Sequence, residues 1–417
     1  MTRRVDAALV GSLFSLALLV RLVPLLFSTL PYNIDGFALA RIAQEFGSTG
    51  RWTLNPADPN IDDLKLPAFS LLWSAQAQLG GLDPLTELQA ILPVLTATVM
   101  VPVYLLGVKL TGSRRVAVAA GVFLALFGSF LFLTSVVMKE SLALIVLPAI
   151  VLTFHERADP RKRGIAMVLL LGMVFLHHVT LLMAVGAVGA LILLEHRRAL
   201  SRGRFSPRAF ALDTVTGLGP FAAGMAYYAV VDLGTVPTSA DDLVLFVAIV
   251  IVLAALLARA WRPASMRHGR RAGVSQTGVL LVPAFVIGGI LFNARTALFA
   301  GTLRTTTAFL SLLPPVLVLA GFALLGYSLM RRTANRANDV VLALAVGPVA
   351  LATFGILRGL DAFSLRVVYR SFDFLDYALA LLAAIGWGSI WHRLGFHRGG
   401  KAALAAVFVG ALLATAP

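Results

Sequence analysis

The chain has no cysteine among its 417 residues and few charged residues. Without cysteine it forms no disulfide and no thiolate metal site. Charged residues make up 13% of the chain, whereas soluble domains carry about a quarter. Together with 59% hydrophobic residues and a mean hydropathy of +0.88, this scarcity excludes a soluble protein. The sequence also lacks an internal repeat, a low-complexity tract and the small-residue cleavage site of a signal peptide.

Long apolar runs recur along the whole chain and predict an all-α fold. We expect a polytopic transmembrane helical bundle of about 13 spans, forming a single domain over residues 1–417. The predicted spans are 5–27, 87–108, 115–134, 140–154, 164–178, 179–195, 209–231, 243–260, 275–293, 306–330, 339–357, 370–391 and 400–416.

The net charge of +15 raises the alternative of nucleic-acid binding. In a membrane protein, however, Lys and Arg gather in cytoplasmic loops. With a cytoplasmic amino terminus, 25 of the 35 Lys and Arg fall inside, and 14 of the 20 Asp and Glu fall outside. This separation predicts a multi-pass protein of the cell membrane with no nucleic-acid partner and an external carboxyl terminus.

Two assignments fix the direction of the later helices. The short stretch 67–81 holds Ser70, Ser74 and two glutamines, so we expect an interfacial helix on the outer surface. The apolar run 164–198 is too long for one straight span. Dividing it at His177 and His178 keeps the basic segment that follows on the cytoplasmic side.

The first external connection, residues 28–86, is long and acidic. Within it, Leu39, Ile42, Ala43 and Phe46 follow the spacing of one helix face, and Gly47 is expected to end the run. The pattern predicts amphipathic juxtamembrane helices half-buried in the outer leaflet.

Ionisable residues gather at the predicted outer ends of the helices. Such groups are costly at membrane depth, so they face cavities, pair with one another or serve a function. Arginine suits phosphate through its bidentate fork, and a carboxylate suits proton abstraction or a divalent ion. The candidates are Asp35, Lys139, Glu140, His177, His178, Arg295, Arg304, Arg366, Tyr369 and Arg370.

Each candidate also has a structural interpretation. Asp35 suits the N-cap of a helix over 36–46, and Lys139 with Glu140 suits a helix start. The two histidines suit a helix break, since one His pair is a weak metal signature. Arg295 and Arg304 suit a solvated loop. Arg366 and Arg370 suit ion pairs with Asp373 and Asp376.

The segment "RLVPLLFSTLPYNIDGFALARIAQEFGSTG" joins a first span, an acid in the first outer loop and a juxtamembrane helix. "LPAFSLLWSAQAQLGG" and the stretch from "ELQAILPVLTATVM" to "LFLTSVVMKES" follow it. Residues 1–141 thereby resemble the GT-C superfamily of integral-membrane glycosyltransferases. This superfamily includes the oligosaccharyltransferase catalytic subunit, protein mannosyltransferases and bacterial and archaeal enzymes that use polyprenyl-phosphate sugars.

The resemblance implies a GT-C-like fold with Asp35 as the first-loop acid and Glu140 at the place of the second-loop acids. It implies a transferase that moves a sugar from a polyprenyl (dolichyl-type) phosphate donor to a lipid-linked glycan, lipid or protein acceptor on the external face, with inversion. Asp35 is then the general base, Glu140 is the second catalytic residue, and the other candidates bind substrate.

Two departures from the superfamily pattern refine this expectation. The second motif is Lys-Glu rather than a pair of acids, which leaves a divalent cation, Mg²⁺ or Mn²⁺, as an open cofactor. The chain ends at residue 417 without the family's soluble carboxyl-terminal domain, which favours a single-sugar transferase over a complete oligosaccharyltransferase.

Two other classes of protein fit the composition. A transporter or flippase of lipid-linked saccharides usually has charges near the membrane midplane and inverted repeats. Here most predicted outer charges lie at helix ends, with Asp213 as the exception. A non-catalytic subunit of a glycan assembly complex would tolerate changes at Asp35 and Glu140.

Overall fold

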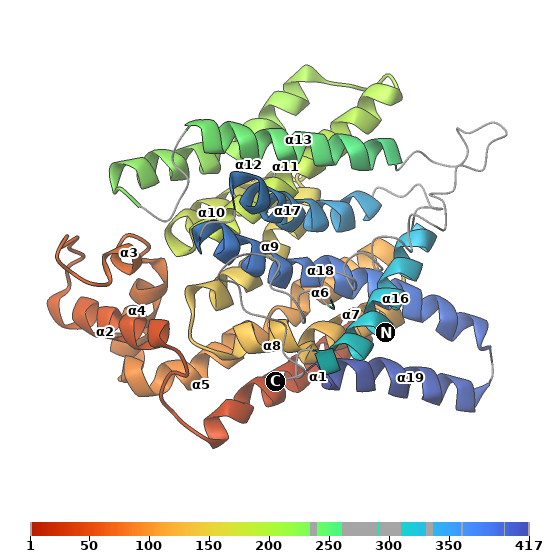
Figure 1. Ribbon diagram of the computed structural model, residues 1–417, viewed down its shortest axis with the longest axis horizontal. Helices are drawn as coiled ribbons and strands as arrows, with labels where there is room; N and C mark the ends of the chain where they lie inside the picture. Colours follow the sequence, from red (N-terminus) through yellow and green to blue (C-terminus); the bar gives the residue numbers. More distant parts are fainter. Residues whose placement is uncertain are drawn as a thin grey trace.

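The computed structural model describes residues 2–233, 240–260, 291, 310–330, 337–359, 362–395 and 397–415, and in these ranges it contains helices and no strands. The all-α prediction is confirmed for this part of the chain (Figure 1). The first helices are α1 (Thr2–Leu22), the 3₁₀ helix η1 (Val23–Leu26), α2 (Ile34–Thr49), α3 (Ile61–Leu64), α4 (Ala68–Gly80), α5 (Pro84–Ala97), α6 (Met100–Thr111), α7 (Arg114–Leu126) and α8 (Gly128–Ser135). The later ones are α9 (Lys139–His155), α10 (Pro160–Leu176), α11 (His178–Ser201), α12 (Pro207–Val230), α13 (Ala240–Ala260), α16 (Leu313–Met330), α17 (Ala337–Arg358), α18 (Ala362–Arg393) and α19 (Arg398–Leu413).

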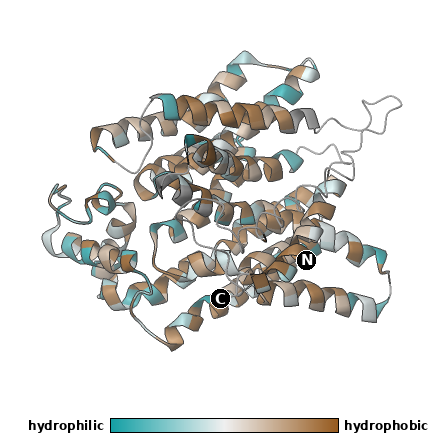
Figure 2. Ribbon diagram, viewed as in Figure 1, coloured by the Kyte–Doolittle hydropathy of each residue, from teal (hydrophilic) through white to brown (hydrophobic). Residues whose placement is uncertain are grey.

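Within the described ranges, six helical segments are long and apolar enough to cross a membrane. A seventh is added if α7 and α8, which meet at a bend of 64°, are one broken span. Figure 2 shows hydrophobic residues along these helices and hydrophilic residues toward their ends. The fold is therefore that of a helical membrane protein. Thirteen spans are not confirmed, and the predicted span 275–293 lies almost wholly outside the described residues.

Close helix packing in the interior depends on glycine. A Cβ on Gly326 of α16 would lie 1.9 Å from the carbonyl oxygen of Leu382 on α18, and one on Gly386 of α18 would lie 2.0 Å from that of Phe322. The two backbones can approach this closely only without side chains at these positions, as is common between membrane helices. The packing of α16 on α18 helps to fix the helix that carries Arg370.

The first connection that was predicted to be external folds as a small helical cluster, α2 to α4, at one end of the molecule (Figure 1). Leu39, Ile42, Ala43 and Phe46 are buried on one face of α2, which confirms the predicted helix face. This face packs within the protein itself instead of in the outer leaflet. The predicted end at Gly47 is wrong. The helix continues to Thr49, and Gly50 ends it with a φ of 63°, a left-handed conformation that glycine adopts without strain.

Helix α4 coincides with the stretch predicted to be interfacial. Its thirteen residues span about 20 Å, which is too short for the bilayer core of about 30 Å. Phe69 and Trp73 on α4 are buried, and the Ser70 hydroxyl donates to the Leu39 carbonyl of α2. The helix thus packs on α2 instead of crossing as an independent span.

The predicted division of the run 164–198 is confirmed. Helix α10 ends at Leu176 and α11 begins at His178, with His177 in extended conformation between them. The His177 Nδ1 accepts a hydrogen bond from the Thr180 backbone N–H at 3.3 Å, which makes His177 the N-cap of α11. This break places both histidines at the end of a helix rather than within a span.

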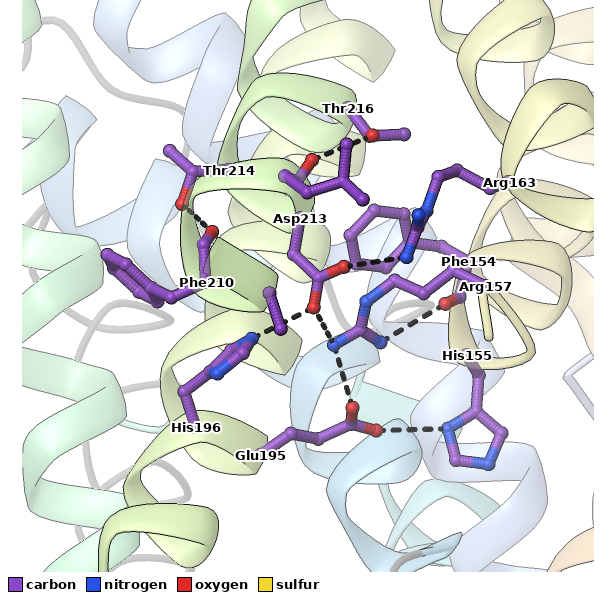
Figure 3. Close-up of polar contacts among 12 residues, drawn as sticks. Phe154, His155, Arg157, Arg163, Glu195, His196, Phe210, Asp213, Thr214 and Thr216 are labelled. Carbon is purple, nitrogen blue, oxygen red and sulfur yellow. Dashed lines mark hydrogen bonds and ion pairs between the residues drawn. The ribbon is translucent and has the colours of Figure 1, made fainter. Parts of the chain in front are cut away.

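At the other end of α11, a buried ion network joins α9, α10, α11 and α12 (Figure 3). Arg157, which follows α9, lies between Glu195 of α11 and Asp213 of α12, with both nitrogen–oxygen distances 2.8 Å. His196 and Arg163 also contact the Asp213 carboxylate. Asp213, the acid that did not fit the outer-end pattern, therefore holds helix ends together.

Candidate functional site

The acidic loop and the membrane helices together enclose a polar cavity of about 230 Å³. Two of its sides come from α2 and α3 of the first external connection, and the others come from the ends of α9 and α11 and from α18. The side chains that line it are Asp35, Leu39, Asp62, Asp63, Leu66, Lys139, Glu140, His177, His178, Val179, Val367 and Arg370. Six of the ten predicted site residues are thus brought together.

Glu140 is the best-connected acid of this cavity. It lies in the first turn of α9, and its side chain is almost entirely buried. It forms an ion pair with Arg370 of α18, and its Oε1 lies 3.2 Å from Nε2 of His177. One carboxylate therefore joins α9, α11 and α18, and it holds the Arg370 guanidinium at the cavity wall.

The hydrogen bonds of His177 define its tautomer. Because the Thr180 backbone N–H donates to Nδ1, the proton of the neutral ring lies on Nε2, the nitrogen nearest to Glu140. The Thr180 hydroxyl lies 2.8 Å from the same Nδ1. Burial, followed by the nearby charge of Lys139, lowers the pKa of His177 to about 3. The imidazole is therefore neutral at physiological pH and lies beside the Glu140 carboxylate.

Lys139 connects the membrane helices to the acidic loop. Its ammonium group donates to the Asp63 carboxylate of α3, and both side chains are largely buried. Next to this pair, Oδ1 of Asp62 lies 3.5 Å from Nζ of Lys65. The Lys65 ammonium also donates a hydrogen bond to the Asp232 carbonyl. These contacts hold α3 over the cavity.

Asp35 differs from the other acids of the cavity. It lies in the first turn of α2, exposed, and the N-cap residue is Asn33, so the N-cap interpretation of Asp35 is wrong. Among the residues that the structure describes, it has no hydrogen bond or ion pair, although its charge acts on Arg370. Asp62, Asp63 and Glu140 each have a cationic partner. In the part of the chain that the structure describes, Asp35 is thus the lining carboxylate without a cationic partner.

The remaining predicted residues are placed only in part. Arg295 and Arg304 lie outside the described residues, and α18 carries Arg366 and Tyr369, whose side chains lie outside the described parts. His178 lines the cavity, and its Nδ1 is buried without a hydrogen-bond partner among the described residues. The predicted pairing of Arg370 with Asp373 and Asp376 is replaced by the ion pair with Glu140. Asp376 accepts a hydrogen bond from Ser129 instead.

The carboxylates do not fit a divalent cation held by protein ligands alone. Among the described residues, no three acids or histidines come close enough to share a metal ion. Asp63 and Glu140 are engaged by Lys139 and Arg370.

Sequence reasoning did not select Asp62 and Asp63 as site residues. Both were recognised only as part of the acidic loop, because nothing in the sequence indicates which loop acid folds back over the membrane helices. In the structure, the short helix α3 (Ile61–Leu64) carries these two acids over the membrane helices. The one sequence feature that marks this helix is the pair of acids just before "LKLP".

Fold and site together define a class of protein: a helical membrane protein with a cavity lined by charged side chains at one end. No protein-family model and no curated protein matches the chain. The fold is similar to that of the oligosaccharyltransferase of Archaeoglobus fulgidus in its apo crystal structure, with a TM-score of 0.57 and 14% identity over 97% of this chain. A second crystal structure of that enzyme, with zinc and sulfate, aligns with a TM-score of 0.49 and 16% identity over 97% of this chain. The chain spans about half the length of that enzyme, 55% in the first alignment and 53% in the second.

Proposed function

We propose that the protein is a membrane glycosyltransferase of the GT-C type that uses a polyprenyl-phosphate-linked sugar as donor. The observation that carries the proposal is Asp35, a carboxylate without an ion-pair partner among the described residues, in a cavity that also contains a lysine and an arginine. The similarity of the fold to an archaeal oligosaccharyltransferase supports the same class of chemistry. The acceptor is a lipid-linked glycan, a lipid or a protein on the external face of the cell membrane.

The proposed step is a single displacement. The acceptor hydroxyl oxygen forms a bond to the anomeric carbon of the sugar while the bond from that carbon to the phosphate oxygen breaks. The hydroxyl proton passes to the Asp35 carboxylate, and the bonding electrons leave with the polyprenyl phosphate. Attack from the face opposite the leaving group inverts the anomeric configuration. General base catalysis of this kind contributes about 10²- to 10⁴-fold.

The leaving phosphate has a favourable place among the described side chains. Helices α9 and α11 both begin at the cavity, with Lys139 and His178 as their first residues. The unpaired backbone N–H groups and dipole of a helix N-terminus attract anions. Arg370 and Lys139 add positive charge beside these helix ends, and charge stabilisation of the leaving group is strongest in a site with little water.

The carboxylates limit how the phosphate binds. Four acids and two cations line the cavity. Glu140 holds Arg370 and Asp63 holds Lys139 in place, so both pairs must persist while the phosphate binds. Glu140 and Asp63 accordingly have positioning roles in this proposal. Asp35 is the catalytic residue, and the second catalytic role expected for Glu140 becomes the placement of Arg370.

The test uses purified protein in nanodiscs with a panel of polyprenyl-phosphate monosaccharides and candidate acceptors. Mass spectrometry follows the release of polyprenyl phosphate, and NMR of the product gives the anomeric configuration. The proposal expects release from one donor, dependent on acceptor, with an inverted product. Donor that moves between leaflets without loss of its sugar would replace this proposal with transport.

A further inference from the structure

A second polar cavity, of about 270 Å³, lies at the opposite end of α11. The first cavity contains His178, the first residue of this helix, whereas the second extends from Glu195 to Arg204 at its end. The 24 residues of α11 span about 36 Å, which exceeds a bilayer core of about 30 Å. The second cavity is thus separate from the site of the proposed transfer, and it plays no part in that chemistry.

The acids of this cavity already have cationic partners. Arg157, only 5% exposed, lies between Glu195 and Asp213 (Figure 3). Arg198 donates to the Asp339 carboxylate at 2.7 Å. Arg157 also keeps a buried Nε–H without an acceptor among the described residues. These contacts fix the inner wall of the cavity and give each of its lining acids a cationic partner.

Two further arginines line the cavity without an acidic partner among the described residues, Arg202 and Arg204. A turn at the end of α11 positions them. Gly203 between them has a φ of 65°, and the Arg204 backbone N–H donates to the Ala199 carbonyl at 2.9 Å. Four arginines and two acids line the cavity, so it carries two positive charges in excess. That charge matches a phosphate group, whose oxygens accept bidentate hydrogen bonds from guanidinium.

The surroundings suit a phosphate that is attached to a lipid. Phe205, directly after Arg204, is 41% exposed, and its ring packs against His196 of the ion network with centroids 6.1 Å apart. The exposed apolar ring offers contact to an acyl chain, next to arginines that can bind its phosphate. We propose that this cavity binds a phosphate group, supplied by an anionic phospholipid headgroup or by free phosphate, through Arg202 and Arg204.

The test uses the full chain in nanodiscs of phosphatidylcholine with a minor fraction of phosphatidylglycerol. Lipid retained after transfer to detergent is counted by native mass spectrometry, with and without excess inorganic phosphate. The site variant is Arg202→Gln with Arg204→Gln. The control is Arg161→Gln with Arg197→Gln, which removes the same charge from exposed residues at the same end that do not line the cavity.

The proposal expects retention of phosphatidylglycerol to fall about tenfold in the site variant and less than about twofold in the control. Retention that survives excess inorganic phosphate assigns the site to a lipid headgroup, and displacement assigns it to free phosphate. Equal losses in both double variants would overturn the proposal, because only diffuse surface charge would then be acting. Absence of any preference for phosphatidylglycerol or phosphate in the wild type would overturn it as well. Thermal unfolding of all three proteins shows that each is folded.

Discussion

Nε2 of His177 lies 3.2 Å from Oε1 of Glu140, although 37 residues separate the two in the sequence. This contact links the start of α11 to the start of α9, and Arg370 of α18 forms an ion pair with the same carboxylate. A neutral imidazole beside the carboxylate does not cancel its charge, so Glu140 retains the charge that holds Arg370. The proposed phosphate site depends on this arrangement.

Glu140→Gln is expected to weaken donor binding more than it slows turnover. The amide keeps the side-chain volume but loses the charge that holds Arg370. Loss of a hydrogen bond between charged groups costs about 1.5–3 kcal/mol, or about 10- to 100-fold in binding. Steady-state kinetics should therefore show a raised KM for the donor. Glu45→Gln, an exposed change on α2, is the control, and an unchanged KM in Glu140→Gln would show that Arg370 needs no such partner.

The Lys139–Asp63 pair is expected to hold the external loop on the membrane helices. We predict a coupling free energy of about 0.5–3 kcal/mol in a double-mutant cycle of Lys139→Met and Asp63→Asn. The exposed pair Arg41–Glu45, with side chains 46% and 45% exposed, should couple by about 0.2–1 kcal/mol. Chemical unfolding measures both cycles, and equal coupling in the two would remove the structural role of Lys139.

His177 is expected to destabilise the fold as the pH falls. Its folded pKa of about 3 lies below the unfolded value of about 6.5, so the unfolded chain binds a proton between these values and the folded chain does not. Stability contributed by the neutral ring is full above about pH 6.5 and declines toward pH 3. In His177→Gln this part of the pH dependence should disappear from the unfolding free energy. If the unfolding free energies of wild type and variant had the same pH dependence, the lowered pKa of His177 would be contradicted.

Gly326→Ala is expected to lower the free energy of unfolding by about 1–3 kcal/mol, because the new methyl group overlaps the Leu382 carbonyl of α18. Gly321→Ala on the same helix meets no atom within 4 Å and should change stability by less than about 1 kcal/mol. Thermal unfolding in detergent compares the two. Similar values would mean that α16 and α18 do not require this close approach.

Sequence reasoning predicted the helical class, the break at His177 and the buried face of α2, because each follows from a local pattern. Hydropathy indicates apolar helices, and the spacing of Leu39, Ile42, Ala43 and Phe46 defines one helix face. The end of α2 was misplaced because both Gly47 and Gly50 suit a helix end. Only the tertiary fold shows which of them adopts a left-handed conformation.

The candidate site was predicted less completely, for a physical reason. Charge position along each helix indicated that Asp35, Glu140, His177 and Arg370 share one end of the bundle. It did not indicate which acid pairs with which cation. The pairing of Glu140 with Arg370, and of Asp63 with Lys139, depends on contacts between segments distant in sequence. The same holds for Asp213, whose partners come from α10, α11 and the end of α9.

The central claim is that Asp35 is the general base of a sugar transfer. The most direct measurement compares wild type, Asp35→Asn and Glu45→Gln in the nanodisc assay, with the rate of polyprenyl phosphate release and the affinity for donor measured on the same samples. Asp35→Asn should bind donor normally and release polyprenyl phosphate about 10²- to 10⁴-fold more slowly, while Glu45→Gln should behave as wild type. Release at the wild-type rate from folded Asp35→Asn would contradict the claim.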